Sequence, residues 1–121
     1  ARWLRGVLRE RLAFDGAGFS DDLSMAGARQ IKGRVLTLTE AILAALDAGC
    51  DLALLCNQSL NGGAVLDDAI EGLARAQAEN RWQPQEVSEQ RRRVLLPASP
   101  AQAWDALMRD ARYRQALEWL P

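Results

Sequence analysis

Two consecutive carboxylates, Asp21 and Asp22, are the residues of this sequence best suited to chemistry. They follow a short, glycine-flanked apolar run that ends in Phe19 and Ser20. Such a run leading into paired acids is the pattern of a buried strand that delivers a carboxylate to a cleft, and barrel enzymes place catalytic side chains at the carboxyl ends of their strands. The alternative is that Ser20, Asp21 or Asp22 caps the next helix, because Ser and Asp are favoured at helix N-caps.

Composition and charge limit the classes of protein and partner. The chain has 121 residues, of which 49% are hydrophobic and 26% charged, which is a globular composition for one domain. The net charge of -1 gives no electrostatic attraction for nucleic acid or an anionic membrane, and no apolar run reaches the length of a membrane span. We therefore expect a cytoplasmic protein with no nucleic-acid partner and no membrane partner.

Cysteine and histidine usage bears on redox state and metals. Cys50 and Cys56 fall on one predicted strand, where six residues of extended chain separate them by roughly 20 Å. That is too far for a disulfide, so both are expected to be reduced thiols, consistent with the cytoplasm. The sequence has no histidine, and its carboxylates and thiols do not show metal-ligand spacing. We expect no metal and no cofactor.

Hydrophobic periodicity and capping signals predict the elements. Thr37 and Glu40 form a capping-box pattern at the start of one helix, and Gly49 ends it. Ser99 to Gln102 combines an N-cap, a proline and a glutamine, which predicts the start of another helix. The expected order is a helix over 2–12, a strand over 17–20, a loop with a helical turn over 23–33, a helix over 37–48, a strand over 50–57, helices over 64–78 and 84–95, and two more helical pieces from 99 onward.

Side-chain patterns predict which faces are buried. The run 50–57 is almost unbroken in its apolar character, which is typical of a strand covered on both faces in a parallel sheet. The inward faces of the later helices are predicted at Leu66, Ile70 and Leu73, and at Trp104, Leu107, Met108 and Ala111. The triplet of arginines at 91–93 is predicted to be a solvated helix end.

The fold class that follows is α/β with a βαβ unit. Two strands cannot cover both of their own faces, and each would leave an unpaired edge. We therefore expect a part of a larger α/β fold whose missing strands lie upstream. Residues 1–80 are expected to hold the βα units, and residues 81–121 a helical extension packed on them.

Two blocks of the sequence resemble one family, the bacterial β-N-acetylhexosaminidases of glycoside hydrolase family three. The first block is Phe19-Ser20-Asp21-Asp22-Leu23-Ser24-Met25 followed by Gly27-Ala28, and the second is Ala45-Leu46-Asp47-Ala48-Gly49-Cys50-Asp51 continuing to Leu55-Cys56-Asn57. The opening helix is similar as well, at Trp3-Leu4 and Leu8-Arg9.

The resemblance implies a fold and a reaction. It implies that the chain is the C-terminal portion of a (β/α)₈ TIM barrel, with its last two strands and their helices, followed by C-terminal helices. In that alignment Asp21 is the nucleophile, and Asp22 and Ser20 support it. The family removes β-linked N-acetylglucosamine from anhydromuropeptides in cytoplasmic peptidoglycan recycling, by retention through a covalent glycosyl-enzyme intermediate. Met25 and Asn57 are expected to line the substrate site, with packing and a turn as their respective alternatives.

The departures from the family pattern limit the activity of the chain alone. The family's proton donor resembles a histidine of an earlier barrel loop, and its sugar-binding Lys-His and Arg positions also belong to upstream strands. This chain has no histidine, so we expect it to be inactive by itself. The alternative class is a non-enzymatic interaction module that dimerises or docks on a partner through exposed strand edges.

Overall fold

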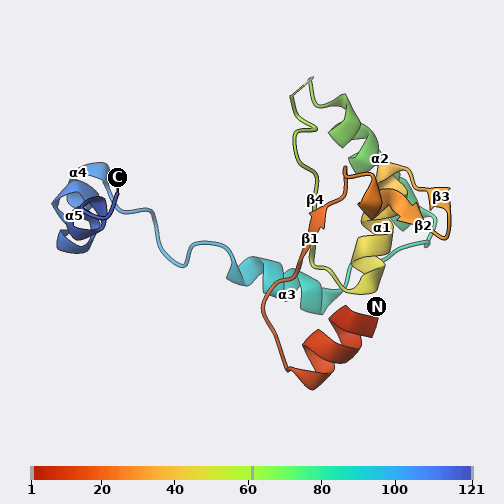
Figure 1. Ribbon diagram of the computed structural model, residues 1–121, viewed down its shortest axis with the longest axis horizontal. Coiled ribbons are helices and arrows are strands. Elements are labelled where there is room, and N and C mark those ends of the chain that lie inside the picture. The colour runs from red at the N-terminus through yellow and green to blue at the C-terminus, as the bar shows by residue number, and fades with distance from the viewer. Residues whose placement is uncertain (1, 61, 121) are drawn as a thin grey trace.

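The computed structural model describes residues 2–60 and 62–120 of the chain. Helices dominate a mixed α/β arrangement (Figure 1). In chain order the elements are η1 (Arg2–Arg11), β1 (Phe19–Asp22), η2 (Gly27–Arg29), β2 (Gln30–Ile31), β3 (Arg34–Val35), α1 (Leu38–Ala48), β4 (Leu52–Leu54), α2 (Ala64–Ala78), α3 (Glu86–Val94), α4 (Trp104–Arg109) and α5 (Ala111–Leu117). The helix η1 has the wide π-type winding, and η2 is a single 3₁₀ turn.

A parallel pair of strands lies at the centre of the molecule. β1 pairs with β4 in parallel, with Phe19 opposite Leu52, and α1 provides the crossover between them. Figure 1 shows the two strands side by side, with α1 and α2 to one side of them. The predicted βαβ unit and its parallel pairing are confirmed.

The two strands differ from their predicted extents. β1 begins at Phe19, later than expected, so the acid pair lies inside the strand at its carboxyl end. β4 is only three residues long, and Leu54 is 42% exposed and Phe19 58% exposed. The prediction that the second strand is covered on both faces is therefore wrong for this chain, because two strands alone leave outer edges and a face uncovered.

Local signals set the ends of α1. The Thr37 hydroxyl accepts the Glu40 N–H at 3.2 Å, and a Glu40 carboxylate oxygen accepts the Thr37 N–H at 2.8 Å. Gly49 follows the last turn with φ of 115°, a left-handed conformation that glycine adopts without strain. The capping box and the glycine stop are both confirmed.

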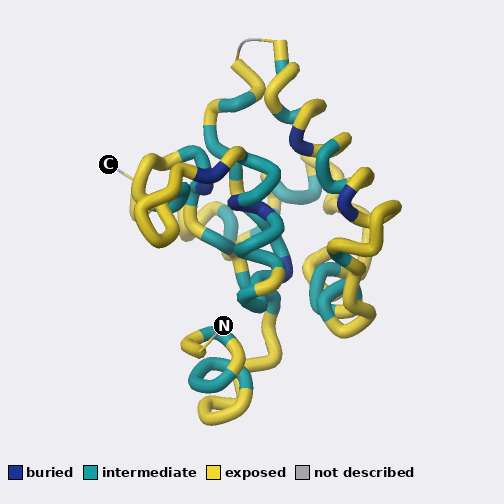
Figure 2. Tube along the Cα trace, turned by 90° about the vertical axis from the view of Figure 1, so that its right-hand side faces the viewer, coloured by how far each residue is buried: buried dark blue, intermediate teal, exposed yellow. Residues whose placement is uncertain are grey.

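The core is small and lies where α1 meets α2 and the chain segments on either side of the β2–β3 hairpin. Figure 2 shows buried segments along this part of the trace, and the polar residue Asp51, before β4, is buried as well. On α2 the buried residues are alanines, Ala69 and Ala76, while Ile70 is 64% exposed. The prediction of Ile70 as an inward residue is wrong, because α2 presents its small side chains to α1. The central cluster consists of Leu23, Leu36, Ala41, Ile42 and Ala69.

A short antiparallel hairpin, β2–β3, occupies the segment predicted to be a loop with a helical turn. The turn is present as η2, but the hairpin was not expected. Its two central residues, Lys32 and Gly33, have φ of 51° and 77°, as a two-residue type I′ turn requires. Lysine seldom adopts this conformation, which is why the sequence gives no hairpin signal here.

The C-terminal helices lie apart from the rest of the chain. Figure 1 shows α4 and α5 as a separate pair at the far left, joined to α3 by an extended segment. α4 begins after Ala103, so the helix start predicted at Ser99 to Gln102 is wrong. Its predicted inner face is also wrong, since Trp104 is 66% exposed and Met108 41% exposed. A capping signal contributes only about 1 kcal/mol, and a short helix needs a buried face as well.

Two further predictions can be compared with the described residues. Cys50 and Cys56 are both free, as expected, and they are half-buried. Within residues 2–60 and 62–120, the helices are too short or too polar to cross a bilayer.

The contact between α1 and α2 generates a test of the fold. A Cβ added at Gly72 would lie 2.4 Å from Thr39 Oγ1 and 2.7 Å from Thr39 Cγ2. We expect Gly72→Ala to lower the free energy of unfolding by about 1 kcal/mol, because overpacking outweighs the better helix propensity of alanine. Urea denaturation followed by circular dichroism measures the change.

A double-mutant cycle with Thr39→Ala tests whether Thr39 causes the cost of Gly72→Ala. In a Thr39→Ala background the space opens, so the same substitution at Gly72 should become neutral or stabilising. Gly27→Ala is the matched control, since nothing lies within 4 Å of a Cβ there. Equal costs of Gly72→Ala in both backgrounds would show that Thr39 does not limit the helix contact.

Candidate active site

The acid pair lies at the edge where the two parallel strands end. Asp21 and Asp22 are the last residues of β1, and Cys56 and Asn57 follow β4. Because parallel strands run in the same direction, their carboxyl ends meet at one edge. The chain therefore brings the two acids to the edge at which α/β barrels carry their active sites.

Asp22 is bound to the polypeptide around it. One carboxylate oxygen, Oδ1, accepts the Ser24 N–H at 2.9 Å and the Cys56 N–H at 3.1 Å, and the other, Oδ2, accepts the Ser24 hydroxyl at 2.7 Å. The Cys56 N–H, the Ser24 hydroxyl and the Ser24 N–H hold the pKa of the Asp22 carboxyl below its ordinary value. Its carboxylate thus joins the end of β4 to the turn after β1.

Asp21 has a different environment. Its side chain is exposed, and its Oδ1 accepts the N–H of the next residue, Asp22, at 2.8 Å. No ion pair to Asp21 is found among the residues that the structure describes. The Asp21 carboxylate is therefore open to a ligand.

The other predicted site residues lie near the same edge. The Ser20 hydroxyl accepts the Leu54 N–H at 2.9 Å and donates to the Asp21 carbonyl at 2.7 Å. Met25 is 53% exposed in the turn after the acids. Asn57 is exposed, with φ of 60°, in the turn that follows β4.

Cys56 follows β4, and its N–H donates to Asp22, but its thiol is not an alternative nucleophile. Burial raises the pKa of its thiol, and the charges of Asp22 and Asp21 raise it further. The thiol is therefore protonated at neutral pH, and the thiolate is the reactive form of cysteine. No group of three or more potential metal ligands is found in the described part of the chain.

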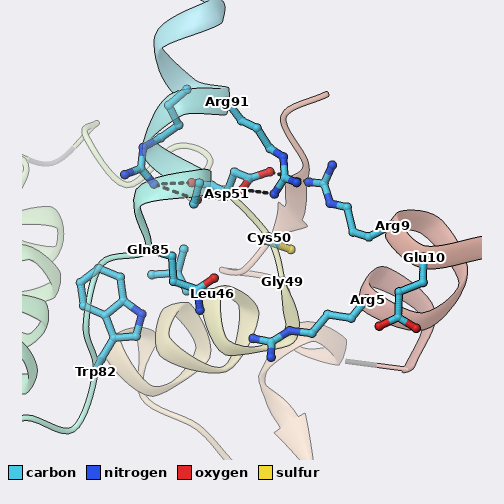
Figure 3. Close-up of a pocket in the computed structure, with 12 residues that line it drawn as sticks. Arg5, Arg9, Glu10, Leu46, Gly49, Cys50, Asp51, Trp82, Gln85 and Arg91 are labelled. Atoms are coloured by element: carbon cyan, nitrogen blue, oxygen red, sulfur yellow. Dashed lines mark hydrogen bonds and ion pairs between the residues drawn. The ribbon is translucent and has the colours of Figure 1, made fainter. Parts of the chain in front are cut away.

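The opposite end of the strands holds a charged cluster that the sequence reasoning missed. Asp51 is 3% exposed, and its Oδ2 accepts Arg9 Nη2 at 2.6 Å and the Gly18 N–H at 2.8 Å. Arg91 Nη1 lies 3.7 Å from Asp51 Oδ1, and Arg92 Nη1 donates to the Asp51 carbonyl at 2.9 Å. Figure 3 shows side chains from η1 and α3 converging on Asp51.

The cluster borders a cavity of about 300 Å³ between η1, the end of α1 and α3. Because Asp51 and Gly18 precede their strands, this cavity lies at the amino ends of β1 and β4, away from the acid pair. In barrel folds that end is the one associated with stability. A charged residue inside an apolar run was the available signal, since Asp51 stands between Cys50 and Leu52.

Competing effects set the ionisation of Asp51. Burial raises its pKa, but the Gly18 N–H, the Ser88 hydroxyl and the charges of Arg9 and Arg91 together lower it more. The net pKa of Asp51 lies below its ordinary value, so the group is a buried carboxylate.

This cluster also corrects the prediction for the arginine triplet. Arg91 donates to Asp15 Oδ1 from both Nε and Nη2, at 3.0 and 2.9 Å, while Arg92 binds the Asp51 carbonyl. Only Arg93 is the solvated helix end expected, with a side chain that is 72% exposed. The prediction is wrong for the first two arginines, because Arg91 lies near the buried Asp51 carboxylate and Arg92 binds the Asp51 carbonyl.

Comparison with known proteins identifies the class. Residues 1–96 match the family model described as the glycosyl hydrolase family 3 N terminal domain. The chain therefore belongs to glycosyl hydrolase family 3, which confirms the resemblance found in its two sequence blocks.

Individual relatives carry one name. The chain is 43% identical over 115 residues to a "Beta-hexosaminidase" of Bordetella parapertussis, which is 95% of this chain and 28% of that protein. It is 41% identical over 115 residues to one of Thiobacillus denitrificans, with the same coverage. A third, of Methylobacillus flagellatus, is 61% identical over 57 residues, 47% of this chain and 15% of that protein. The chain thus spans about 28% of the length of the first two relatives.

The buried carboxylate generates a test of stability. We expect Asp51→Asn to lower the free energy of unfolding by about 3 kcal/mol, because removing one partner of a buried pair leaves the other charges uncompensated. The lowered pKa fixes the sign of the pH dependence. The charge of Asp51 stabilises the fold above its unfolded pKa near 3.8, and this contribution is lost as the pH falls through the lower folded value.

Urea midpoints at neutral pH and at acid pH measure both effects. The difference between wild type and Asp51→Asn should shrink as the pH is lowered. Asp68→Asn, an exposed acid on α2, is the matched control and should stay within about 0.5 kcal/mol of wild type. A gap that persists unchanged at low pH would show that charge is not what Asp51 contributes.

Proposed function

We propose that this chain supplies the nucleophile-bearing part of a retaining β-N-acetylhexosaminidase. The substrate of the whole enzyme would be terminal β-linked N-acetylglucosamine on anhydromuropeptides, in the cytoplasm. Membership of glycosyl hydrolase family 3 and relatives named beta-hexosaminidase support this proposal. On this proposal β1 and β4 are the last two strands of a (β/α)₈ barrel, and residues 81–121 are a helical extension.

The observation that carries the proposal is the unequal environment of the two acids. Asp22 is occupied by three hydrogen bonds from Ser24 and Cys56, whereas the Asp21 carboxylate is exposed at the end of a parallel strand. A nucleophile needs an accessible charged oxygen, and a supporting residue needs fixed partners. Asp21 therefore suits the role of nucleophile, and Asp22 that of a support.

The proposed reaction has two steps. In the first, a carboxylate oxygen of Asp21 bonds to the anomeric carbon as the glycosidic C–O bond breaks, and the leaving oxygen takes a proton from a general acid. In the second, water attacks the same carbon and transfers a proton to that acid's conjugate base, and the bond to Asp21 breaks. Two displacements at one carbon retain its configuration.

The general acid and the main sugar contacts lie outside this chain on the proposal. The sequence has no histidine, and Asp22 is held away by its own partners. Met25 and Asn57, exposed beside the strand ends, are proposed to line the sugar site. The isolated chain should accordingly lack turnover, since general acid assistance alone is worth about 10²–10⁴-fold.

A graft tests the nucleophile. This chain replaces the matching 115-residue segment of the Bordetella parapertussis relative, and hydrolysis of an aryl β-N-acetylglucosaminide is measured. We expect the graft to turn over and Asp21→Asn in the graft to lower kcat by about 10⁴-fold or more, because the amide cannot form the glycosyl ester. The isolated chain should show no turnover.

Two controls separate loss of the nucleophile from loss of the fold. Asp21→Asn keeps the size of the side chain, so the urea midpoint of the isolated chain should not change. Asp68→Asn in the graft should leave kcat and KM as they were. Wild-type kcat in the Asp21→Asn graft would sink the assignment of the nucleophile.

A second candidate function is a non-enzymatic interaction module, and the exposed apolar side chains favour it. Phe19 on β1, Trp104 on α4 and Trp119 after α5 are 58%, 66% and 82% exposed. Exposed apolar side chains on more than one element favour association. On this reading the chain binds itself or another protein through these residues.

Sedimentation velocity over a range of concentrations tests self-association of the isolated chain. We expect dimers or larger species, because uncovered strand edges and aromatic residues gain free energy when buried. Phe19→Ser and Trp104→Ser should each reduce the associated fraction, with Ser59→Ala, an exposed loop position, as the control. A monomer at every concentration would contradict the module.

A further inference from the structure

We propose that Ser20 is a positioning residue for the nucleophile, because its hydroxyl fixes a β-bulge that sets the direction of the Asp21 carboxylate. This inference rests on the proposed function of Asp21 and adds a role for the residue before it.

The register between the two strands contains one extra residue. Phe19 lies opposite Leu52 and Asp22 opposite Leu54, so three steps along β1 match two along β4. Ser20 and Asp21 together therefore oppose the single residue Ala53. This is a bulge, a feature that is rare in parallel pairs and that re-aims a side chain near active sites.

The bulge changes where the acids point. In a regular strand successive side chains alternate between the two faces, and a one-residue offset shifts every later side chain relative to its partner strand. The offset falls between Phe19 and Asp22, the stretch that contains Asp21. The direction of its carboxylate thus depends on whether the bulge is kept.

The Ser20 hydroxyl joins the two sides of the bulge. It accepts the Leu54 N–H of β4 at 2.9 Å and donates to the Asp21 carbonyl at 2.7 Å. Only a group that both donates and accepts can make these two bonds, and among side chains of this size that means Ser or Thr. Ser20 consequently fixes the peptide group that follows Asp21.

Asp22 closes the other end of the bulge. Its Oδ1 accepts the Cys56 N–H at 3.1 Å, and the Leu23 N–H donates to the Leu54 carbonyl at 2.9 Å. Asp21 lies between these two cross-strand attachments, and its own Oδ1 accepts the Asp22 N–H at 2.8 Å. The carboxylate therefore follows the orientation of the backbone that Ser20 and Asp22 hold.

Nucleophilic attack is sensitive to such an orientation. The reacting atoms must start about 3–3.5 Å apart and aligned, and a misplacement of about 1 Å can cost about 10²-fold. Loss of the Ser20 hydroxyl should lower the rate of attack while leaving the sugar contacts, and hence KM, largely unchanged.

The experiment compares Ser20→Ala, Ser20→Thr and the control Ser59→Ala. Amide hydrogen exchange of the isolated chain, followed by NMR, reports the bulge without any need for activity. We expect exchange at the Leu54 amide to accelerate by about three- to tenfold in Ser20→Ala and to return toward wild type in Ser20→Thr. Amides of α1 report that the variants remain folded.

Kinetics of the same substitutions in the graft report the role. We expect Ser20→Ala to lower kcat by about 10- to 100-fold with KM changed less than about twofold, and Ser20→Thr to restore most of kcat. Ser59→Ala should match wild type in both measurements.

The outcomes separate this inference from the proposed function. Faster exchange at Leu54 with unchanged kcat in Ser20→Ala would overturn the positioning role and leave Asp21 as the nucleophile. Unchanged exchange at the Leu54 amide in Ser20→Ala would overturn the claim that the Ser20 hydroxyl holds the bulge. A Ser20→Thr variant with a kcat as low as that of Ser20→Ala would also overturn the positioning role of the Ser20 hydroxyl. Full kcat in the Asp21→Asn graft would overturn the proposed function, whatever the result at Ser20.

Discussion

The buried carboxylate of Asp51 constrains the elements around it. A charge removed from water must be matched by donors, and here they come from Arg9 on η1, Gly18 before β1 and Arg91 on α3. The start of β4, the start of β1 and two helices are thereby held at one point. Elements that are distant in the sequence meet there because an unmatched charge would cost several kcal/mol.

The two ends of the parallel pair differ in how their carboxylates are bound. At the amino ends, the buried Asp51 carboxylate lies against Arg9, Arg91 and the Gly18 N–H. At the carboxyl ends, Asp22 is satisfied by the polypeptide while Asp21 stays exposed. On the proposed function, this difference follows the rule for barrels that stability resides at one end of the strands and chemistry at the other. The parallel pairing of β1 with β4 brings the two amino ends together at one edge and the two carboxyl ends together at the other.

The core explains why so much of the chain is exposed. Its buried hydrophobic residues are few and mostly small, and they gather where α1 packs against α2. Phe19 and Leu54, on the paired strands, are partly open to solvent. A chain that spans about 28% of its relatives' length has these surfaces available for covering by further structure. Membership of the family and the exposed strand pair are both consistent with the expectation, from the apolar pattern, of a part of a larger α/β fold.

Features whose causes are local could be predicted from the sequence. The ends of α1 are set by Thr37, Glu40 and Gly49 through contacts within one helix. The order strand, helix, strand could be read from consecutive local patterns, and a helical crossover of this kind joins parallel strands. The acid pair and the resemblance to the family could also be recognised in the sequence, because each depends on short runs of consecutive residues. The hairpin was not, since Lys32 carries no turn signal. Long-range packing, in contrast, buries Asp51, brings Arg91 and Arg92 to it, and places a bulge at Ser20 and Asp21. Those features depend on contacts between residues more than thirty positions apart, and no local pattern encodes such contacts.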